Sequence, residues 1–493
     1  MKNVKRILVN SFLGVFLAVA MPLQTAGAVR MDGTESDALK TSIQPILGDK
    51  RLQGSIAGIS IRDAISGGLL YSYNGSVRLR PASNLKLLTA ASALHVLGSG
   101  YTFQTKVLTD GKINGSVLKG NVYLQGNGDP TLLAKDVNRL AKKLKLRHIS
   151  KIEGNIYGDD SRYDSLRYSI DLPWSDEDDY YGAGVSALTV STGQEFDNGT
   201  AIIQVKPGKK AGDPAAIRVI PDSKYLTIKQ DVQTVKADGR RFVTTIREHG
   251  NNQVTVKGTI PLQSSVLRKS VAVWEPSLYA LTLFKQSLKA SGIKFEKHSE
   301  KMKRTPKKAV ILAVHQSKPL GKMILPLLKY SNNGHAEIFT KELGKVVYNE
   351  GTWNSGTMAI GDIMSTFGVR QDHLYLRDGS GISQSDLVPP NDITKLLFAI
   401  QSYDWFPVFL NALPVSGSKS KELGGTLRNR LMQKEAAGRI RAKTGSLTGV
   451  SSLSGYAVSI SGKRFIFSVM INNFIVPDIK SIEDKIALSL LNL

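Results

Sequence analysis

Ser83-Asn84-Leu85-Lys86 opens the apolar run LLTAASALHVL over residues 87–97, and this stretch decides the fold. Residues three apart on a helix lie on one face, so the amine of Lys86 comes beside the hydroxyl of Ser83. A serine hydroxyl is a weak nucleophile at neutral pH and needs a base within hydrogen-bond reach. The run that follows is apolar nearly all round, which predicts a helix buried inside a domain. Burial and a neighbouring cation would lower the lysine pKa and give the neutral amine that accepts the serine proton.

Two further motifs follow in the chain, Ser331-Asn332-Asn333 and Lys443-Thr444-Gly445. Ser-x-x-Lys alone is weak evidence, because it recurs in the polar stretch 416–421, where the composition predicts a solvated loop. Lys-Thr-Gly occurs once, ahead of two strand-like segments. The order and local context of the three motifs together predict a serine acyl-transfer site, with Lys443 as the candidate for the neighbouring cation.

The three motifs resemble those of penicillin-binding proteins and serine β-lactamases. The rest of the chain is similar to one branch, the class C low-molecular-mass D-alanyl-D-alanine carboxypeptidases, which often also act as endopeptidases. Its forms in Gram-positive bacilli are the most similar. The stretches that carry the resemblance are RPASNLK (80–86), GNVYLQGNGDPT (120–131), YYGAGVSAL (180–188), YSNNGHAE (330–337), DGSGIS (378–383) and RAKTGSL (441–447).

The resemblance implies a role for each catalytic residue. Ser83 would form the acyl-enzyme, and Lys86 would be its general base. Ser331 would pass a proton to the leaving amine, while Asn333 would orient the acyl amide and hold Lys86.

The resemblance also implies how substrate is bound. Lys443 and Thr444 would bind the terminal carboxylate, and the backbone N–H groups of Ser83 and Ser446 would form the oxyanion hole. It implies no cofactor and no metal. The seven histidines show no metal-ligand spacing, and the absence of cysteine excludes thiol catalysis and disulfides.

The implied fold is α+β, a β-lactamase/transpeptidase-like catalytic domain of antiparallel sheet and helices with two inserted β-rich domains. Lys86 and Ser331 lie 245 residues apart (331 − 86), so the chain between them must be mostly insertion. The predicted limits are 29–95 with 316–493 for the catalytic domain, 96–189 with 261–315 for inserted domain II, and 190–260 for nested domain III.

The amino terminus has the pattern of a secretory signal peptide. A basic start precedes a mostly apolar stretch over 7–23, and Ala26-Gly27-Ala28 gives a small-x-small cleavage site. Cleavage would remove residues 1–28, and the mature protein would begin near Val29. An uncleaved anchor is the alternative. We expect an exported protein of the cell envelope.

The formal net charge is +24, and the predicted signal peptide accounts for three positive charges, which leaves +21 (24 − 3). The basic residues are scattered and no nucleic-acid motif is present, so we expect no nucleic-acid partner. An anionic cell wall or membrane surface fits an exported chain, and general solubility is the alternative explanation of the charge.

Two further features each have two interpretations. His335 follows the Ser331 motif, but Lys86 already supplies a base, so packing is the expected role of the imidazole. The acidic run 176–179 beside Trp174 predicts a solvated loop. Recognition of the free amine end of a peptidoglycan side chain is the alternative.

Three functions fit these observations. The first is a D,D-peptidase acting on peptidoglycan stem peptides, with β-lactam antibiotics as inhibitors. A serine β-lactamase would need a deacylation base such as Glu-x-x-Leu-Asn, and the segments 248–252 and 275–279 both depart from that pattern. The third is a non-catalytic envelope-binding protein on the same fold, which the intact motifs oppose.

Overall fold

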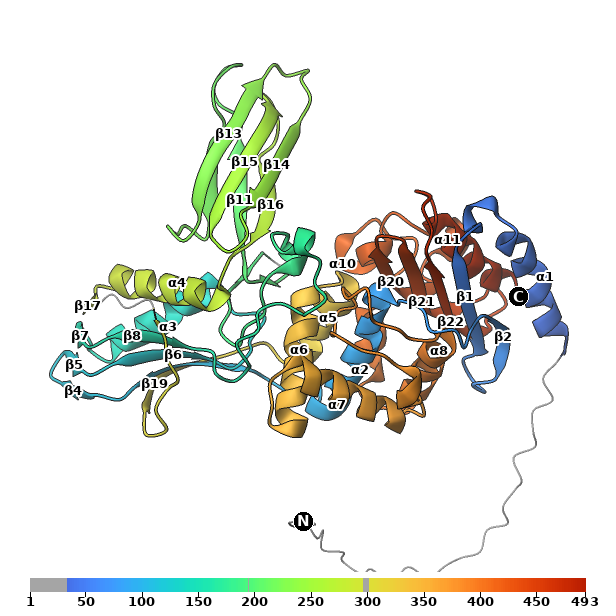
Figure 1. The fold of residues 1–493 in the computed structure, drawn as a ribbon, viewed down its shortest axis with the longest axis horizontal. Helices are drawn as coiled ribbons and strands as arrows, with labels where there is room; N and C mark the ends of the chain where they lie inside the picture. Colours follow the sequence, from blue (N-terminus) through green and yellow to red (C-terminus); the bar gives the residue numbers. More distant parts are fainter. Residues whose placement is uncertain (1–32, 194, 296–300) are drawn as a thin grey trace, which may run out of the picture.

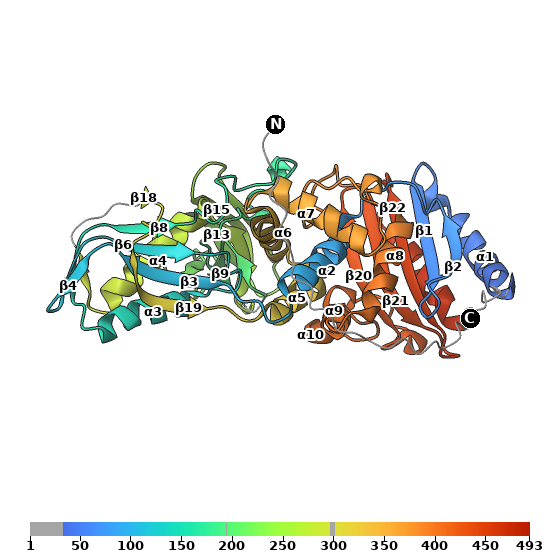
Figure 2. The ribbon, with the colours of Figure 1, turned by 90° about the horizontal axis from the view of Figure 1, so that it is seen from below.

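The computed structural model describes residues 33–193, 195–295 and 301–493 (Figure 1). The predicted signal peptide, residues 1–28, lies outside this part of the chain. Figure 2 shows an elongated molecule with a five-stranded sheet and its helices at one end and a second group of strands at the other. Among the described helices, none is both long enough and apolar enough to cross a membrane.

The five-stranded sheet is antiparallel throughout, in the order β2-β1-β22-β21-β20. It pairs strands from both ends of the chain, with Ile59 opposite Val469. Both faces of β22 are buried after its first residue, which is why its sequence is apolar almost continuously instead of alternating. The strands are β1 (Ile56–Asp63), β2 (Leu69–Tyr73), β20 (Ile440–Leu447), β21 (Val450–Val458) and β22 (Arg464–Asn472).

Helices cover both faces of this sheet (Figure 1). On one face α1 (Gly33–Leu47) and α11 (Lys480–Ser489) bury Leu39, Ile43 and Ile482 in one cluster with sheet residues. On the other face lies α8 (Pro390–Ala399), and Tyr456 of the sheet donates a hydrogen bond to the Leu397 carbonyl at 2.7 Å. The antiparallel sheet between helices confirms the expected α+β class.

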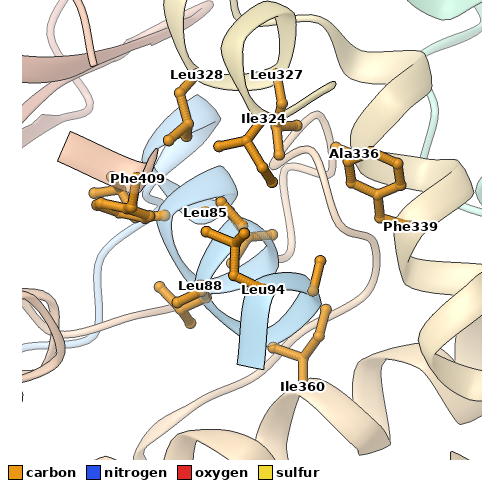
Figure 3. Packing of buried hydrophobic residues seen from close by; sticks show 14 of the residues in the cluster. Leu85, Leu88, Leu94, Ile324, Leu327, Leu328, Ala336, Phe339, Ile360 and Phe409 are labelled. Carbon is orange, nitrogen blue, oxygen red and sulfur yellow. The ribbon is translucent and has the colours of Figure 1, made fainter. Parts of the chain in front are cut away.

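The helix that follows Ser83 is α2 (Leu85–Leu97), and it is buried on every side over its first ten residues. It lies among α5 (Leu320–Lys329), α6 (Asn333–Tyr348), α7 (Trp353–Thr366) and α9 (Phe406–Ala412). Figure 3 shows Leu85, Leu88 and Leu94 directed at residues of these four helices. The all-round apolar pattern therefore predicted its environment correctly.

The far end of the molecule holds two sheets, β17-β7-β5-β4 and β18-β8-β6-β3-β19. In these sheets, strands from residues 104–159 pair with strands from residues 294–316. The pairs are β3 with β19, β7 with β17, and β8 with β18. The strands are β3 (Gln104–Thr109), β4 (Lys112–Asn114), β5 (Val117–Lys119), β6 (Val122–Gly126), β7 (Lys151–Glu153), β8 (Ile156–Asp159), β17 (Lys294–Phe295), β18 (Lys301–Met302) and β19 (Val310–Gln316).

Two helices pack on these sheets, α3 (Ala134–Leu146) and α4 (Pro276–Ala290). The sequence interpretation named only strands in this region, so it was incomplete here. Val137, Leu140 and Leu144 of α3 are buried at helical spacing against the sheet residues.

A third group of strands stands apart in Figure 1, and we call this group of two sheets the upright sheet. It comprises the sheets β12-β11-β16 and β13-β15-β14. The exact limits of the two inserted domains stay a prediction. The strands are β11 (Thr200–Lys206), β12 (Ala216–Ile220), β13 (Thr227–Val235), β14 (Phe242–Arg247), β15 (Gln253–Pro261) and β16 (Leu267–Ala272), with the short hairpin β9 (Ser191–Thr192) and β10 (Asp197–Asn198) at their base.

Candidate active site

Ser83 lies in the 3₁₀ turn Ala82–Asn84 that leads directly into α2. The side chain of Lys86 is fully buried, and its Nζ lies 2.9 Å from Ser83 Oγ. The same nitrogen donates to Asn333 Oδ1 at 2.7 Å and to the Ser380 carbonyl at 2.8 Å. With two of its hydrogens bound in this way, a neutral amine directs its lone pair at the serine hydroxyl. The helical spacing therefore produces the serine–lysine contact that it predicted, an arrangement suited to activation of a hydroxyl.

Burial lowers the pKa of the Lys86 amine from its usual 10.5 to about 7. The charges of Glu337, Asp378 and Asp386 act in the opposite direction and limit that fall. Because a general base works best with a pKa near the operating pH, Lys86 is suited to accept a proton at neutral pH.

A second serine–lysine pair faces the first. Lys443 Nζ donates to Ser331 Oγ at 2.8 Å and to the Thr444 carbonyl at 2.7 Å. Burial, and then the charge of Lys86, hold the pKa of Lys443 well below its ordinary value. Ser331 has a φ of +63°, a left-handed conformation that is strained for serine and common at functional sites.

The strand β20 forms the opposite wall at the edge of the sheet. A Cβ on Gly445 would lie 3.0 Å from the backbone nitrogen of Ser83 and 2.9 Å from the Pro81 carbonyl. Glycine at this position therefore lets β20 approach the nucleophile. Thr444 Oγ1 is fixed by a 2.7 Å hydrogen bond to the hydroxyl of Thr426.

These walls enclose a cleft of about 480 Å³. All seven residues proposed from the sequence gather here. The two lysines, Lys86 and Lys443, are buried beneath it. The other five line it: Ser83, Ser331, Asn333, Thr444 and Ser446.

A carboxylate that the sequence analysis did not assign supports Lys86 from below. Glu337 is buried and accepts hydrogen bonds from the backbone nitrogens of Gly379 and Ser380, both at 3.0 Å, and from the Trp353 indole at 2.7 Å. It thereby holds the loop whose Ser380 carbonyl receives Lys86. Burial raises the pKa of Glu337 to about 7.

Asp378 shapes the same loop by accepting from the backbone nitrogens of Gly381 at 2.7 Å and Ser383 at 2.8 Å. Burial raises the pKa of both Asp378 and its neighbour Asp386. The stretch 378–383 contributed to the family resemblance, but no pattern in the sequence places it beneath Lys86.

Residues of the inserted segments complete the cleft. Asn333 Nδ2 donates to the Tyr181 carbonyl at 3.0 Å. Asn332 accepts from the His335 nitrogen at 3.0 Å, which caps α6, and donates to the Glu195 carbonyl at 3.0 Å and to Asp197 Oδ1 at 3.2 Å. The contacts with Tyr181, Glu195 and Asp197 were missed because these residues lie more than 130 positions upstream of the motif.

The predicted packing role of His335 is confirmed. The ring is fully buried, its centroid lies 5.9 Å from that of Phe339, and burial lowers its pKa to about 4. The prediction of a solvated loop at 416–421 was wrong at its start, because Ser416 is buried and donates to the Ala436 carbonyl.

The acidic run 176–179 is not simply a solvated loop. Glu177 binds the buried guanidinium of Arg247 at 3.0 Å, so this carboxylate is structural. Asp176 lines the cleft, whereas Asp178 and Asp179 line a neighbouring cavity.

A buried lysine beside a serine, a second lysine–serine pair and an adjoining sheet edge define a serine acyl-transfer enzyme of the penicillin-binding class. Residues 39–493 match the model of the D-Ala-D-Ala carboxypeptidase 3 (S13) family, and the chain belongs to this family. It is a serine-type D-Ala-D-Ala carboxypeptidase, which confirms the expected enzyme class and disfavours the β-lactamase alternative.

Several characterised proteins are similar to this chain. A D-alanyl-D-alanine carboxypeptidase of Actinomadura sp. strain R39 is 34% identical over 462 residues, which is 93% of this chain and 85% of the relative. The D-alanyl-D-alanine carboxypeptidase DacB of Haemophilus influenzae is 27% identical over 438 residues, which is 88% of this chain and 89% of the relative. The crystal structure of penicillin-binding protein 4 from the same organism superposes with a TM-score of 0.76 at 26% identity, covering 92% of this chain and 98% of that one.

Proposed function

We propose that this enzyme removes the terminal D-Ala from peptidoglycan stem peptides through an acyl-enzyme on Ser83. The observation that carries the proposal is the 2.9 Å contact between Ser83 Oγ and the buried Lys86 amine, whose pKa lies near neutrality. Ser83 Oγ attacks the carbonyl carbon of the penultimate residue as Lys86 takes the hydroxyl proton. The backbone N–H groups of Ser83 and Ser446 stabilise the oxyanion.

Breakdown of this intermediate needs a proton on the leaving nitrogen. Ser331, fixed by Lys443 at 2.8 Å, donates its hydroxyl proton to the D-Ala amine and takes up in return the proton that Lys86 holds. The C–N bond breaks, and an ester remains on Ser83. Water then adds to the ester, Lys86 accepts a water proton, and Ser83 leaves reprotonated with release of the shortened peptide. Lys443 and Thr444 bind the carboxylate of the terminal D-Ala until the C–N bond breaks and D-Ala leaves.

A β-lactam would acylate Ser83 in the same way. The crystal structure of the Haemophilus penicillin-binding protein 4 in complex with a β-lactam, similar to this chain with a TM-score of 0.71 at 25% identity, supports this extension. Because the chain offers no Glu-x-x-Leu-Asn deacylation motif between Lys86 and Ser331, we expect a long-lived adduct.

The test is covalent labelling with a fluorescent penicillin. Wild type is expected to label and S83A to show none, because the nucleophile is gone. S418A is the matched control, since Ser418 and Lys421 form another Ser-x-x-Lys pair and should label fully. Equal labelling of S83A and wild type would show that Ser83 is not the nucleophile. Release of D-alanine from a pentapeptide then establishes the peptidase activity.

We also propose that the enzyme opens peptide cross-links, since the leaving amine at Ser331 can belong to D-Ala or to a second stem peptide. The rates on a pentapeptide and on a cross-linked dimer measure this balance. A dimer that stays intact at concentrations where pentapeptide is cleaved would restrict the enzyme to carboxypeptidase activity.

We further propose that the protein is exported to the cell envelope and retained there on anionic wall polymer or lipid. The signal-peptide pattern of residues 1–28 and the net charge support this location. Sequencing of the protein recovered from the envelope is expected to give an amino terminus near Val29. Recovery of an intact first residue would favour the uncleaved anchor.

A further inference from the structure

A second cavity of about 1050 Å³ lies beside the catalytic cleft. Its lining residues come from the loop 174–180 and from strands β14 and β16 of the upright sheet. Figure 1 shows where these two strands lie in the molecule. Tyr180, Glu195 and Asp197 line both spaces. The two spaces therefore adjoin at these residues, and we call the second one the Trp174 cavity.

Trp174 is 72% exposed and yet held in place. One face of its indole stacks on His249 with ring centroids 3.7 Å apart and planes 15° from parallel. His249 Nδ1 lies 3.0 Å from Glu177 Oε2, and the other oxygen of Glu177 binds Arg247 at 3.0 Å. Trp174 thus presents a flat apolar surface backed by a fixed polar network.

The network continues into the protein interior. Arg247 is fully buried and donates to the carbonyls of Glu248 at 2.8 Å and Asn251 at 3.0 Å. Its guanidinium also lies 5.7 Å from the ring of Trp274, which stacks on Tyr168. A rigid exposed indole connected to so extensive a frame is typical of a surface that binds a ligand.

Most of the remaining lining is hydroxylic or charged. It offers both donors and acceptors around the indole, from Ser175, Thr244, Thr245, Ser270, Asp178 and Arg268. A flat aromatic ring beneath small polar groups matches a sugar ring, whose axial C–H groups pack on the indole while its hydroxyl and amide groups bind the rim.

We propose that the Trp174 cavity binds a saccharide ring of the glycan strand whose stem peptide occupies the catalytic cleft. This inference rests on the proposed function, because peptidoglycan joins the two chemistries in one polymer. It predicts a preference for stem peptides that are still attached to sugar. The adjacency of the two spaces and the hydroxylic lining of the cavity favour sugar over a second stem peptide.

The first test measures binding without catalysis. Peptide-free glycan oligosaccharides are titrated into the S83A protein at high salt, with calorimetry as the readout. We expect binding, weakened about tenfold by the additional W174A substitution and largely retained by W174F. F242A is the matched control, because Phe242 is 54% exposed on β14 but does not line the cavity. No binding, or equal binding by S83A and S83A/W174A, would overturn the proposal.

This readout is independent of turnover. Glycan binding by S83A would stand even if the protein released no D-alanine, and D-alanine release without glycan binding would refute the cavity proposal alone. Full penicillin labelling by W174A in the Ser83-intact protein verifies that the substitution leaves the fold intact.

The second test compares substrates. W174A is expected to raise KM for a disaccharide-linked pentapeptide about tenfold and to leave KM for the free pentapeptide unchanged. H249A, which removes the support behind the indole, should act in the same direction with a smaller effect. If W174A instead impaired only cleavage of a sugar-free cross-linked dimer, the occupant would be a second stem peptide and the saccharide assignment would be wrong.

Discussion

The protonation state of Lys86 controls the proposed reaction, because only the neutral amine accepts the Ser83 proton. Its pKa lies near 7, so the neutral fraction rises as pH increases through 7 and saturates above it. We expect the rate of penicillin acylation to follow that rise. Stopped-flow measurement of acylation between about pH 5 and 9 gives this rising limb of the pH–rate profile directly. A rate that falls as pH increases through 7 would exclude Lys86 as the base.

Glu337 adjusts this limb without contacting substrate. Its negative charge favours the protonated lysine, so E337Q is expected to lower the pKa of Lys86 and move the limb by up to about 1 pH unit toward acid. The acylation rate should fall as well, because an amide meets the Gly379 and Ser380 nitrogens less favourably than a carboxylate.

The pH shift separates a positioning role from a purely structural one. E350Q removes the same charge at an exposed site and should leave the limb in place. An unchanged limb in E337Q would show that Glu337 acts only on the loop geometry.

Sequence reasoning reached the Ser83–Lys86 pair through helical spacing, and it reached the distant Ser331 and Lys443 only through the motifs that carry the family resemblance. The Ser83–Lys86 contact follows from helical geometry, whereas the Ser380 carbonyl beneath Lys86 depends on a loop 294 positions away. Tyr181 was out of reach for the same reason. Its backbone carbonyl holds Asn333, and a carbonyl contact leaves no signature in side-chain identity.

At the scale of elements, α2 is a buried helix and its leucines contribute packing energy. Leu94 is 1% exposed, and L94A is expected to lower the free energy of unfolding by about 3 kcal/mol through lost contacts and a residual cavity. Denaturant unfolding measures the change. L146A is the control in α3, because Leu146 is 79% exposed and its truncation should cost at most about 0.5 kcal/mol. Equal losses for the two variants would contradict the packing argument.

The α+β class was predicted from the sequence, and a strand such as β22 carries a clear signal because both of its faces are buried and its sequence is apolar almost continuously. The helix α3 was missed for a physical reason. Its exposed face is so rich in lysine that its four buried apolar positions stand out only when they are read at helical spacing. Charged solvent faces dilute the apolar signal that sequence reading relies on.

The full chain carries a formal charge of +24, of which +21 (24 − 3) remains after the predicted cleavage near Val29, and this charge should act at long range on an anionic wall. We expect the protein to bind isolated cell walls at about 50 mM salt and to elute as the ionic strength approaches about 500 mM, where charges are screened over a few ångströms. Co-sedimentation across that salt series measures retention. Binding that is unchanged by salt would mean that charge is not what holds the protein to the wall.

The 245-residue separation between Lys86 and Ser331 indicated an insertion but gave no information on how the insertion meets the active site. That contact depends on side chains brought together by the complete fold. Tyr163 illustrates it: the residue precedes the nested strands, yet its ring is buried in the same cluster as α2, and its hydroxyl donates to Glu342 of α6 at 2.9 Å.

The hydrogen bonds of the Asn332 side-chain amide limit how far this enzyme can be shortened. The central residue of its serine motif is tied to Glu195 and Asp197, at the base of the upright sheet. In a truncated enzyme, a short linker would replace the inserted segments between Lys86 and Ser331. This enzyme would keep every proposed catalytic side chain, but it would lose the hydrogen bonds that hold the loop carrying Ser331. The inserted segments and the catalytic domain therefore have to be redesigned together, because deletion of the inserted segments alone will not give a smaller active enzyme.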